Sequence, residues 1–324
     1  MNGSDVVIIG AGPSGAVAGA LLNKRGHSCQ IIERQHFPRF SIGESLLPHC
    51  MDFLDEAGML EAVQAAKFQF KDGARFLRHG EYAVFEFGDQ FTQGWGHTFE
   101  VERAEFDKIL ADEAERQGVT IHYGQTIERV SVDHSNVHAV ATDENGEQHE
   151  YQGRFLLDAS GFGRVLPRLL DLEQPSSFPV RRSLFTHVRD NIDKNHFDRD
   201  KILVTIHPDN PDVWFWLIPF RDGRASVGVV AREEFFGSIP GDHETILKYL
   251  LGVDVELSRI LIDCEFDTPV NTLVGYSSNV SQMCGPGFAL LGNAGEFIDP
   301  IFSSGVTIAL RSASMAAAAV DKIL

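Results

Sequence analysis

The sequence predicts an α/β protein in which a Rossmann-type nucleotide-binding domain is interwoven with a second domain built on an antiparallel β-sheet. Near the N-terminus, a glycine-rich turn stands between an apolar strand and a helix, as at the start of a βαβ unit. From Ser183 to Ala231 one apolar or alternating segment follows another, which is typical of an antiparallel sheet. Strand and helix patterns return near the C-terminus without a low-complexity linker, so we expect the second domain to be inserted into the first.

Length and composition fit this fold and exclude several kinds of partner. The chain has 324 residues, 43% hydrophobic and 23% charged, which is enough for about two domains. A net charge of −18 would repel phosphate backbones, so we expect no nucleic-acid partner, and no apolar run is long enough for a membrane span. The four cysteines lie far apart without metal-type spacing, which predicts reduced thiols in the cytoplasm and no structural metal.

The individual elements follow from the pattern of apolar residues. Asp5–Ile9 and Cys29–Ile32 read as buried strands on either side of a helix at Ser14–Gly26. Further helices are expected at Leu46–Ala66, Arg103–Gln117, Asp242–Ile262 and Ser304–Leu324. Further strands are expected at Val119–Tyr123, Ile127–Val132, Val137–Thr142, Glu147–Tyr151, Leu184–Val188, Ile202–Ile206, Val213–Pro219, Ala225–Val230 and Phe288–Leu291.

The glycine-rich turn, Gly10-Ala11-Gly12-Pro13-Ser14-Gly15, has the GxGxxG spacing of a dinucleotide-binding motif. Gly10 allows the tight turn, Gly12 lets the backbone approach a pyrophosphate, and Gly15 permits close packing of the helix, whose N-terminus favours the anion. Glu33 ends the second strand and is placed to accept hydrogen bonds from the ribose hydroxyls of an adenosine. The motif predicts a bound dinucleotide but does not separate FAD from NAD.

Two distant segments resemble motifs of flavin monooxygenases. Phe155–Gly161, with the sequence FLLDASG, resembles their second pyrophosphate motif, and Leu290–Gly295 resembles their motif near the ribityl chain. The resemblance implies FAD as cofactor and a p-hydroxybenzoate-hydroxylase-like fold. The aspartate usual in hydroxylases is Asn293 here, which still hydrogen-bonds a hydroxyl but carries no charge. Arg103 matches the family arginine near the FAD phosphates and ribityl chain, although a first-turn surface arginine fits the sequence equally well.

Other segments resemble the flavin-dependent halogenases. Trp214–Pro219 reads WFWLIP and holds two of the three tryptophans of the chain. In that family such tryptophans keep the organic substrate away from the flavin, although geranylgeranyl reductases carry a similar strand and aromatic core packing would also explain it. Pro38–Ser45 resembles the loop beside the isoalloxazine, and Asp299–Val306 resembles the flavin-facing loop. The backbone amides of Ser304 and Gly305 are the implied halide site, although in any flavoenzyme of this fold they can face the flavin instead.

The resemblance gives Lys71 the central chemical role, because it matches the family lysine. Its amine would hold hypohalous acid, by a hydrogen bond or as a haloamine, and direct the halogen onto an electron-rich ring. A solvated lysine on a strand is the ordinary alternative, and Lys67 is the second candidate. Phe302 stands where tryptophan halogenases have a glutamate, so the resemblance implies a phenol or pyrrole as substrate rather than free tryptophan.

These observations lead to a defined set of predicted domains and contacts. The FAD-binding domain is predicted to comprise residues 1–67, 96–164 and 284–324, and the substrate domain residues 68–95 and 165–283. The substrate chamber is predicted to include Trp214, Trp216 and Phe302. The predicted cofactor contacts are Gly10, Gly12, Pro13, Ser14, Gly15, Glu33, Arg34, Arg39, Ser41, Ile42, Gly43, Glu44, Arg103, Asp158, Ala159, Gly161, Asn293, Pro300, Gly305 and Val306.

The implied reaction uses reduced FAD, oxygen and chloride or bromide to halogenate a small aromatic substrate, free or bound to a carrier protein. No second GxGxxG motif is present for NAD(P)H, which favours a separate flavin reductase as partner. A monooxygenase or a geranylgeranyl-reductase-like oxidoreductase without halide use is the alternative, and a non-catalytic flavin carrier is the third hypothesis. Family members usually continue into a C-terminal helical segment over the substrate chamber, whereas this chain ends at Leu324, so we expect either a further segment or an unusually open site.

Overall fold

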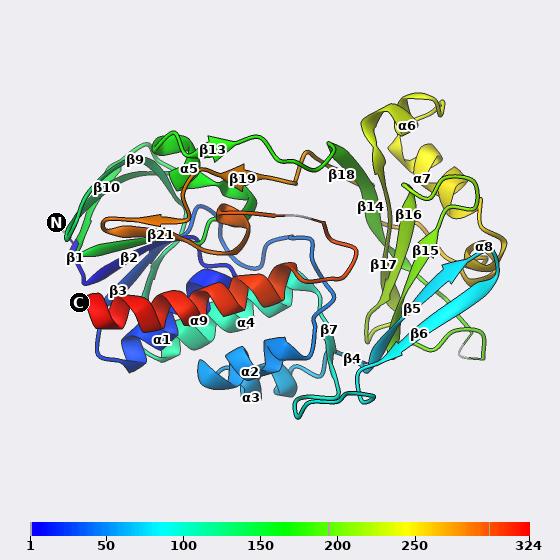
Figure 1. The fold of residues 1–324 in the computed structure, drawn as a ribbon, viewed down its shortest axis with the longest axis horizontal. Helices are drawn as coiled ribbons and strands as arrows, with labels where there is room; N and C mark the ends of the chain where they lie inside the picture. The colour runs from blue at the N-terminus through cyan, green and yellow to red at the C-terminus, as the bar shows by residue number, and fades with distance from the viewer. Residues whose placement is uncertain (1, 194, 298) are drawn as a thin grey trace.

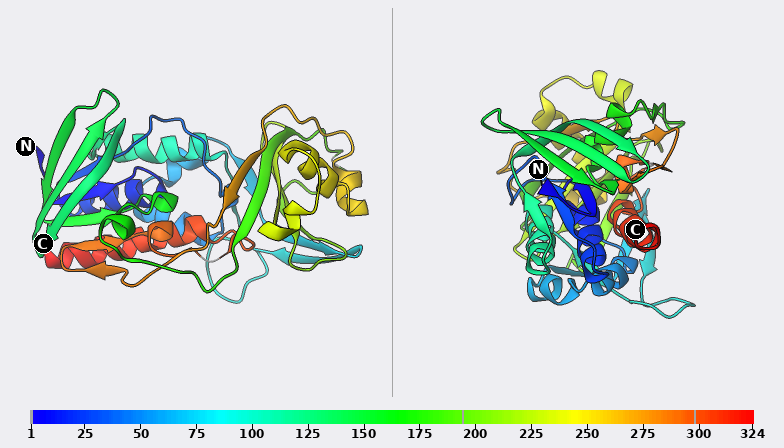
Figure 2. Two further views of the ribbon diagram at one scale, coloured as in Figure 1. Left: turned by 90° about the horizontal axis from the view of Figure 1, so that it is seen from above. Right: turned by 90° about the vertical axis from the view of Figure 1, so that its left-hand side faces the viewer.

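The computed structural model describes residues 2–193, 195–297 and 299–324. Figure 1 shows an elongated molecule with a parallel sheet and its helices at one end and a large, mainly antiparallel sheet at the other. Both termini lie at the end that holds the parallel sheet, and Figure 2 shows that the chain crosses between the two ends several times. This arrangement confirms the predicted α/β architecture with an inserted second sheet.

The parallel sheet has six strands in the order β20-β21-β12-β2-β3-β8, of which only β20 runs antiparallel to its neighbour. The glycine-rich turn joins β2 to α1, and α1 packs against α4 and α9 on one face of the sheet (Figure 1). The apolar strands and the small residues of α1 explain this close packing, because they bury both faces of the sheet. The elements are β2 (Val6–Ile9), α1 (Pro13–Lys24), β3 (Cys29–Ile32), α4 (Arg103–Arg116), β8 (Thr120–His122), β12 (Phe155–Asp158), β20 (Cys284–Gly285), β21 (Phe288–Leu290) and α9 (Gly305–Ile323).

A four-stranded sheet in the order β1-β11-β10-β9 covers the other face of the parallel sheet. Val137 and Tyr151 from this sheet share a core with Val7 and Ile9 of β2. Leu166 belongs to the same core, so α5 packs beside the parallel sheet although residues from 165 onward were assigned to the substrate domain by sequence. The elements are β1 (Asn2–Gly3), β9 (Gln125–Asp133), β10 (Asn136–Asp143), β11 (Gln148–Gly153) and α5 (Val165–Leu169).

The second large sheet has seven strands in the order β18-β14-β17-β16-β15-β5-β6. All neighbouring pairs are antiparallel except β15 and β5, which run parallel, so the sheet is mixed rather than purely antiparallel. Neither β5 nor β6, which lie at one end of this sheet with β6 at its edge, was predicted from the sequence. The strands are β5 (Gly73–Arg78), β6 (Glu81–Glu86), β14 (Arg181–Arg189), β15 (Lys201–Ile206), β16 (Trp214–Pro219), β17 (Arg224–Arg232) and β18 (Asn271–Val274).

Side chains alternate between the two faces of the seven-stranded sheet, as the strand period of two requires. On β16, Phe215 and Leu217 pack against the helices on the outer face. Trp214, Trp216 and Ile218 lie on the opposite face, which looks toward the parallel sheet. The outer face is covered by α6 (Glu233–Gly237), α7 (His243–Leu251) and α8 (Val255–Ile260).

Two segments that were predicted as single helices are each divided in the structure. The segment Leu46–Ala66 contains α2 (His49–Glu56) and α3 (Leu60–Ala65), because Gly58 between them has a φ of 71° that ends the first helix. Asp242–Ile262 contains α7 and α8, because Asp254 caps the second helix by accepting from two of its backbone amides. The prediction of single helices was therefore wrong at both places.

Short elements complete the described part of the chain. A two-stranded ladder joins β4 (Gln69–Lys71) to β7 (Thr98–Glu100), and another joins β13 (Glu173–Gln174) to β19 (Asn279–Val280). Two 3-10 turns lie at Gly161–Gly163 and Gly292–Ala294. Within residues 2–193, 195–297 and 299–324, no helix has the length and apolar character that crossing a membrane requires.

Candidate active site

A cavity of about 760 Å³ lies between the parallel sheet and the seven-stranded sheet. The glycine-rich turn lines it on one side, and the inward face of β16 lines it on the other. Of the predicted cofactor contacts, those that line the cavity are Gly10, Gly12, Pro13, Ser14, Glu33, Arg34, Arg39, Ser41, Ile42, Gly43, Glu44, Arg103, Ala159, Gly161, Asn293, Pro300, Gly305 and Val306. Residues from four separate parts of the sequence therefore meet in one space.

The glycine-rich turn has the tight geometry that its sequence predicts. Gly10 has a φ of 93°, and a Cβ at this position would lie 2.8 Å from the backbone oxygen of Ala159. A Cβ on Gly15 would lie 1.9 Å from the backbone oxygen of Gly10, so Gly15 packs the helix against the turn although it does not line the cavity. The turn therefore leaves the N-terminal end of α1 open toward the cavity, where an anion is favoured.

Glu33 is buried beside this turn. One of its carboxylate oxygens accepts from the backbone amide of Ala11 at 2.8 Å, and the other accepts from the amide of Gln35 at 2.9 Å. The carboxylate thus links the ends of β2 and β3 while it faces the cavity. A carboxylate held in this way keeps further lone pairs for ribose hydroxyls.

Arg103 opens α4 and is only 8% exposed, which differs from an ordinary surface arginine. Its guanidinium forms an ion pair with Asp107, with Nε 2.7 Å from Oδ1, and donates to the backbone oxygen of Ile42 at 2.7 Å. Asp107 also lies 3.2 Å from Arg39. Asp107, a buried carboxylate that was not predicted as a site residue, thus holds the side chains of Arg39 and Arg103 at the cavity. Arg103 in turn fixes the loop that contains Ile42.

Asp158 does not line the cavity, because its carboxylate is used within the fold. It accepts from the backbone amide of Ser160 at 2.8 Å and from that of Leu166 at 2.7 Å. Burial raises the pKa of Asp158 above its usual value. The side chain therefore shapes the turn that presents Ala159 and Gly161 to the cavity.

The loop Asp299–Ser304, predicted to face a flavin, leads directly into α9. Gly305 begins this helix and lines the cavity, whereas Ser304, its N-cap, does not line it. Ser303, just before, has a φ of 56° and lines the cavity as well. Helix α9 spans 19 residues, so its N-terminus places partial positive charge at the cavity wall.

The two tryptophans of β16 form the apolar wall of the cavity. Their ring centroids lie 6.0 Å apart, and Trp216 donates from Nε1 to the hydroxyl of Ser226 at 3.0 Å. The indole of Trp216 lies against Gly228, where an added Cβ would be 2.3 Å from the ring. The missing side chain at Gly228 therefore fixes where the indole lies.

Replacing this glycine should disturb the wall. We expect Gly228→Ala to cost roughly 1–3 kcal/mol of the free energy of unfolding, since overpacking a buried site forces side chains off their rotamers. Because Trp216 must move toward the cavity, FAD affinity should fall as well. Urea unfolding and FAD titration measure the two effects, and wild-type values in both would contradict the described packing.

Glu44, which is buried, and His187, which is half-buried, form a pair that the sequence did not indicate. The Nε2 atom of His187 lies 2.5 Å from a carboxylate oxygen of Glu44, and Glu44 lines the cavity. Burial acts to lower the pKa of His187, but the hydrogen bond and charge of Glu44 outweigh it, so the pKa lies above its ordinary value of 6.5. Phe40, which stacks on Phe185, also covers this imidazole.

This pair makes stability depend on pH in a defined direction. The pKa of His187 is higher in the folded state than in the unfolded state. The pair therefore contributes its full share to the free energy of unfolding below pH 6.5, and this share is lost as the pH rises through the folded-state pKa. We expect the free energy of unfolding to fall over this range in the wild type and to fall less in His187→Gln. Urea unfolding at a series of pH values tests this, and identical slopes would refute it.

Lys71 lies behind the cavity wall and is only 1% exposed. Its Nζ atom donates to the hydroxyl of Ser45 at 2.6 Å and to the backbone oxygen of Leu46 at 2.8 Å, and it lies 5.1 Å from the centroid of the Phe87 ring. Ser45 lines the cavity, so one hydrogen bond separates the amine from it. Burial lowers the pKa of Lys71 to about 8, which makes the neutral amine accessible near physiological pH.

Two other candidate residues lie on the surface instead. Lys67 is exposed on a turn with a φ of 54°. Phe302 is 66% exposed and does not line the cavity, but its ring lies 6.1 Å from that of Phe76 on β5. Burial and a hydrogen bond to a cavity residue therefore distinguish Lys71 from Lys67.

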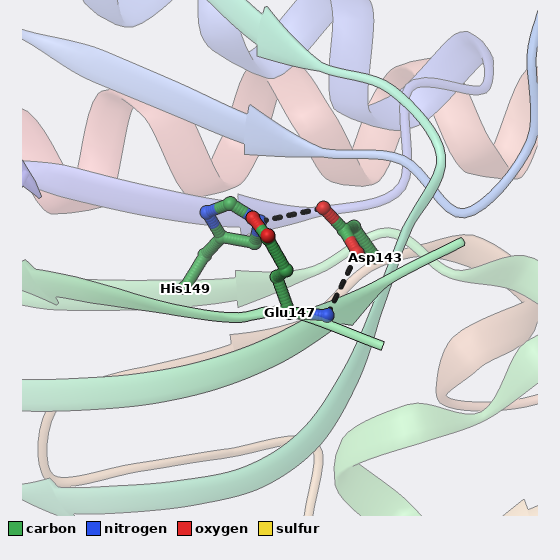
Figure 3. Close-up of side chains that lie close together, drawn as sticks. All are labelled: Asp143, Glu147 and His149. Carbon is green, nitrogen blue, oxygen red and sulfur yellow. Dashed lines mark hydrogen bonds and ion pairs between the residues drawn. The ribbon is translucent and has the colours of Figure 1, made fainter. Parts of the chain in front are cut away.

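One group of possible metal ligands lies on the β10–β11 hairpin (Figure 3), and none of its members lines the cavity. Asp143, Glu147 and His149 offer ligand atoms within 4.8 Å of one another. However, Asp143 already accepts from the backbone amide of Glu147 at 2.9 Å and lies 3.0 Å from Nε2 of His149. These contacts close the Asn145-Gly146 turn, which accounts for the group without a metal.

Comparisons with known proteins agree with this geometry. The FAD binding domain family matches residues 3–235, so the chain belongs to that family. The tryptophan 2-halogenase of Chondromyces crocatus is 32% identical over 339 residues, which cover 100% of this chain and 62% of the relative. The 1H-pyrrole-2-carbonyl-(peptidyl-carrier protein) chlorinase of Pseudomonas fluorescens is 31% identical over 338 residues, 96% of this chain and 74% of the relative. Within the FAD-binding proteins, the chain therefore belongs to the flavin-dependent halogenase family, as its motifs predicted.

A solved structure gives the same fold. The flavoprotein/dehydrogenase of Cytophaga hutchinsonii is 44% identical and superposes with a TM-score of 0.95, covering 99% of this chain and 78% of that protein. The chain thus spans between three fifths and four fifths of the length of these relatives.

Proposed function

We propose that this protein is an FAD-dependent halogenase that uses chloride or bromide to halogenate an electron-rich aromatic ring. The observation that carries the proposal is Lys71, a buried amine with a lowered pKa that lies one hydrogen bond behind a cavity with the features of a flavin site. Membership of the flavin-dependent halogenase family supports the same function.

The residues that line the cavity fit FAD. The glycine-rich turn and the start of α1 would hold the pyrophosphate, Glu33 the adenosine ribose, and Arg39 and Arg103 the remaining phosphate and ribityl groups. Asn293, between these sites and α9, would bind a ribityl hydroxyl through its amide. When bound in its reduced form, FAD supplies the electrons that activate dioxygen.

The residues of this chain would position the halide and the electrophilic halogen, and would keep the substrate away from the flavin. The amides at Ser304 and Gly305 would bind the halide at the start of α9, where the helix dipole favours an anion without a charged side chain. Trp214 and Trp216 would keep the aromatic substrate out of the flavin side of the cavity and so prevent its hydroxylation. Lys71 would then be the amine that receives the electrophilic halogen and presents it to the substrate.

The substrate and the partners form a further part of the proposal. The name of the Pseudomonas fluorescens relative describes action on a pyrrole carried by a peptidyl carrier protein, which favours a phenol or pyrrole substrate, free or on such a carrier. A separate flavin reductase would supply reduced FAD. The four cysteines are free thiols, which fits the reducing conditions of the cytoplasm.

A product assay tests the proposal. The protein is supplied with FAD, a flavin reductase, NADH and chloride or bromide, and with a panel of phenols and pyrroles, each offered free and as a carrier-protein thioester. We expect a halogenated product that depends on both halide and reductase, detected by mass spectrometry. A hydroxylated product, or turnover of NADH by the protein alone, would favour an FAD-dependent monooxygenase or reductase instead.

A further inference from the structure

Glu100 is a buried acid to which the proposed function gives no role. It stands on β7, is 0% exposed, and neither of its carboxylate oxygens has a hydrogen-bond partner. Thr98, on the same face of β7, also has a buried hydroxyl without a partner. Buried polar atoms are nearly always partnered in folded proteins, so an unpartnered pair at one place calls for a functional explanation.

The fold places Glu100 near Lys71, on neighbouring strands of one short ladder. In the ladder between β4 and β7, Lys71 pairs with Thr98 and Gln69 pairs with Glu100. Ser45, the hydroxyl that accepts from Lys71, forms a bridge with Glu100 from the other side. Burial raises the pKa of Glu100 well above its usual range, and the opposing charge of Lys71 is the next strongest influence on it.

The amine of Lys71 has one position left for chemistry. Two of its hydrogen-bonding positions are used, by Ser45 and by the backbone oxygen of Leu46. An ammonium would therefore keep one free proton, and a neutral amine would keep its lone pair free. Because burial opposes charge on both Lys71 and Glu100, the two groups would share one proton if they titrate as a coupled pair.

We propose that Glu100 is the proton partner of Lys71 and positions this amine for halogen transfer, an inference that rests on the proposed function. Glu100 accepts the ammonium proton, which frees the lone pair of Lys71 to attack the halogen of hypohalous acid. The nitrogen–halogen bond forms, the halogen–oxygen bond breaks, and the hydroxide leaves as water with one proton from the nitrogen. When the ring takes the halogen, the nitrogen–halogen bond breaks and the carbon–halogen bond forms. Glu100 then protonates the nitrogen, and the proton lost by the ring carbon restores the carboxyl.

The pair is influenced by few other groups that titrate or carry charge. Cys50 on α2 acts on Lys71, and its own pKa is raised by burial. Three charged residues before β15 act on Glu100, namely Asp198, Arg199 and Asp200. Of these, the charge of Arg199 favours the carboxylate and the two aspartates oppose it.

The test compares the wild type with Glu100→Gln, which keeps the shape of the side chain and removes the acid. The measured quantity is halogenated product formed per oxygen consumed, over a range of pH, because this ratio does not depend on how fast the flavin is reduced. In the wild type the ratio should pass through a maximum. At low pH Lys71 is charged, and at high pH Glu100 has lost the proton that it must return.

For Glu100→Gln we expect the maximum to fall by about 100-fold, which is the usual size of a lost proton-transfer group. The alkaline decline should disappear, because no carboxyl remains to titrate. The acid limb should remain, because it reports the charge on Lys71, whose amine is unchanged in this variant. Glu100→Asp should keep a maximum of reduced height, and Glu102→Gln, the same change two residues away, should leave the profile unaltered.

The outcomes separate this inference from the proposed function. If the wild type halogenates and Glu100→Gln, still folded and FAD-bound, loses product by one factor at every pH or not at all, Glu100 has only a structural role and the inference is overturned. If Glu100→Gln does not bind FAD, the profile of Glu100→Asp decides in its place, and a profile without a maximum overturns the inference. If the wild type forms no halogenated product, the proposed function itself fails.

Discussion

Lys71→Met is expected to lower the yield of halogenated product by about 100-fold or more, because halogen that is not held beside the ring reacts at random or is lost. The substitution keeps much of the volume of the buried side chain but removes the amine that donates to Ser45 and Leu46. FAD binding and oxygen consumption should remain near wild-type values, since Lys71 does not line the cavity. The released hypohalous acid should then appear in a small added trap such as a thioether.

The matched control is Lys67→Met, which changes an exposed lysine four residues earlier. Product from this variant should equal that of the wild type. Equal losses of product in both variants would mean that any positive charge near the β4–β7 ladder is needed, rather than Lys71 in particular. Full activity of Lys71→Met would show that Lys71 takes no part in the chemistry.

Gly15→Ala is expected to weaken FAD binding, so that less flavin remains with the purified protein. The added Cβ would lie 1.9 Å from the backbone oxygen of Gly10, and this atom cannot move without opening the turn. Such overpacking typically costs roughly 1–3 kcal/mol. If this strain destabilises the FAD-bound conformation of the turn, the affinity for FAD falls by about 10- to 100-fold. The visible absorbance of flavin that remains with the purified protein measures the effect directly.

Gly237→Ala provides the control for this substitution. Gly237 ends α6 in an exposed position, and a Cβ there meets nothing within 4 Å. This variant should bind FAD like the wild type. Normal FAD content in Gly15→Ala would show that the turn is more adaptable than its geometry indicates.

Much of the nucleotide-binding half could be predicted because its signals are local. The apolar strands, the glycine spacing and the acid at Glu33 lie within one short stretch, and β3 was predicted with its observed bounds, Cys29–Ile32. The strands of the central part were also found, since their side chains alternate. The edge strand β6 was not found, because every one of its residues is exposed and its pattern has no buried face. Its neighbour β5 was not found either.

The candidate site was less predictable where it depends on contacts between distant residues. Glu44 and His187 are 143 positions apart in sequence, and nothing in either segment indicates that they meet. The burial of Lys71 follows from a ladder of three residues in each strand, which is too short for a periodic signal. Glu100 could not be predicted either, because the lack of hydrogen-bond partners for its carboxylate is a property of the folded chain alone.

The most direct test of the central claim is a single turnover without a reductase. The FAD-loaded protein is reduced by light and a sacrificial electron donor in the absence of oxygen, freed of the donor, mixed with bromide and an aromatic substrate, and then exposed to oxygen. We expect a product with the paired isotope peaks of bromine, formed only when bromide is present and strongly diminished in Lys71→Met. A hydroxylated product that forms equally without bromide would contradict it and assign the cavity to a monooxygenase.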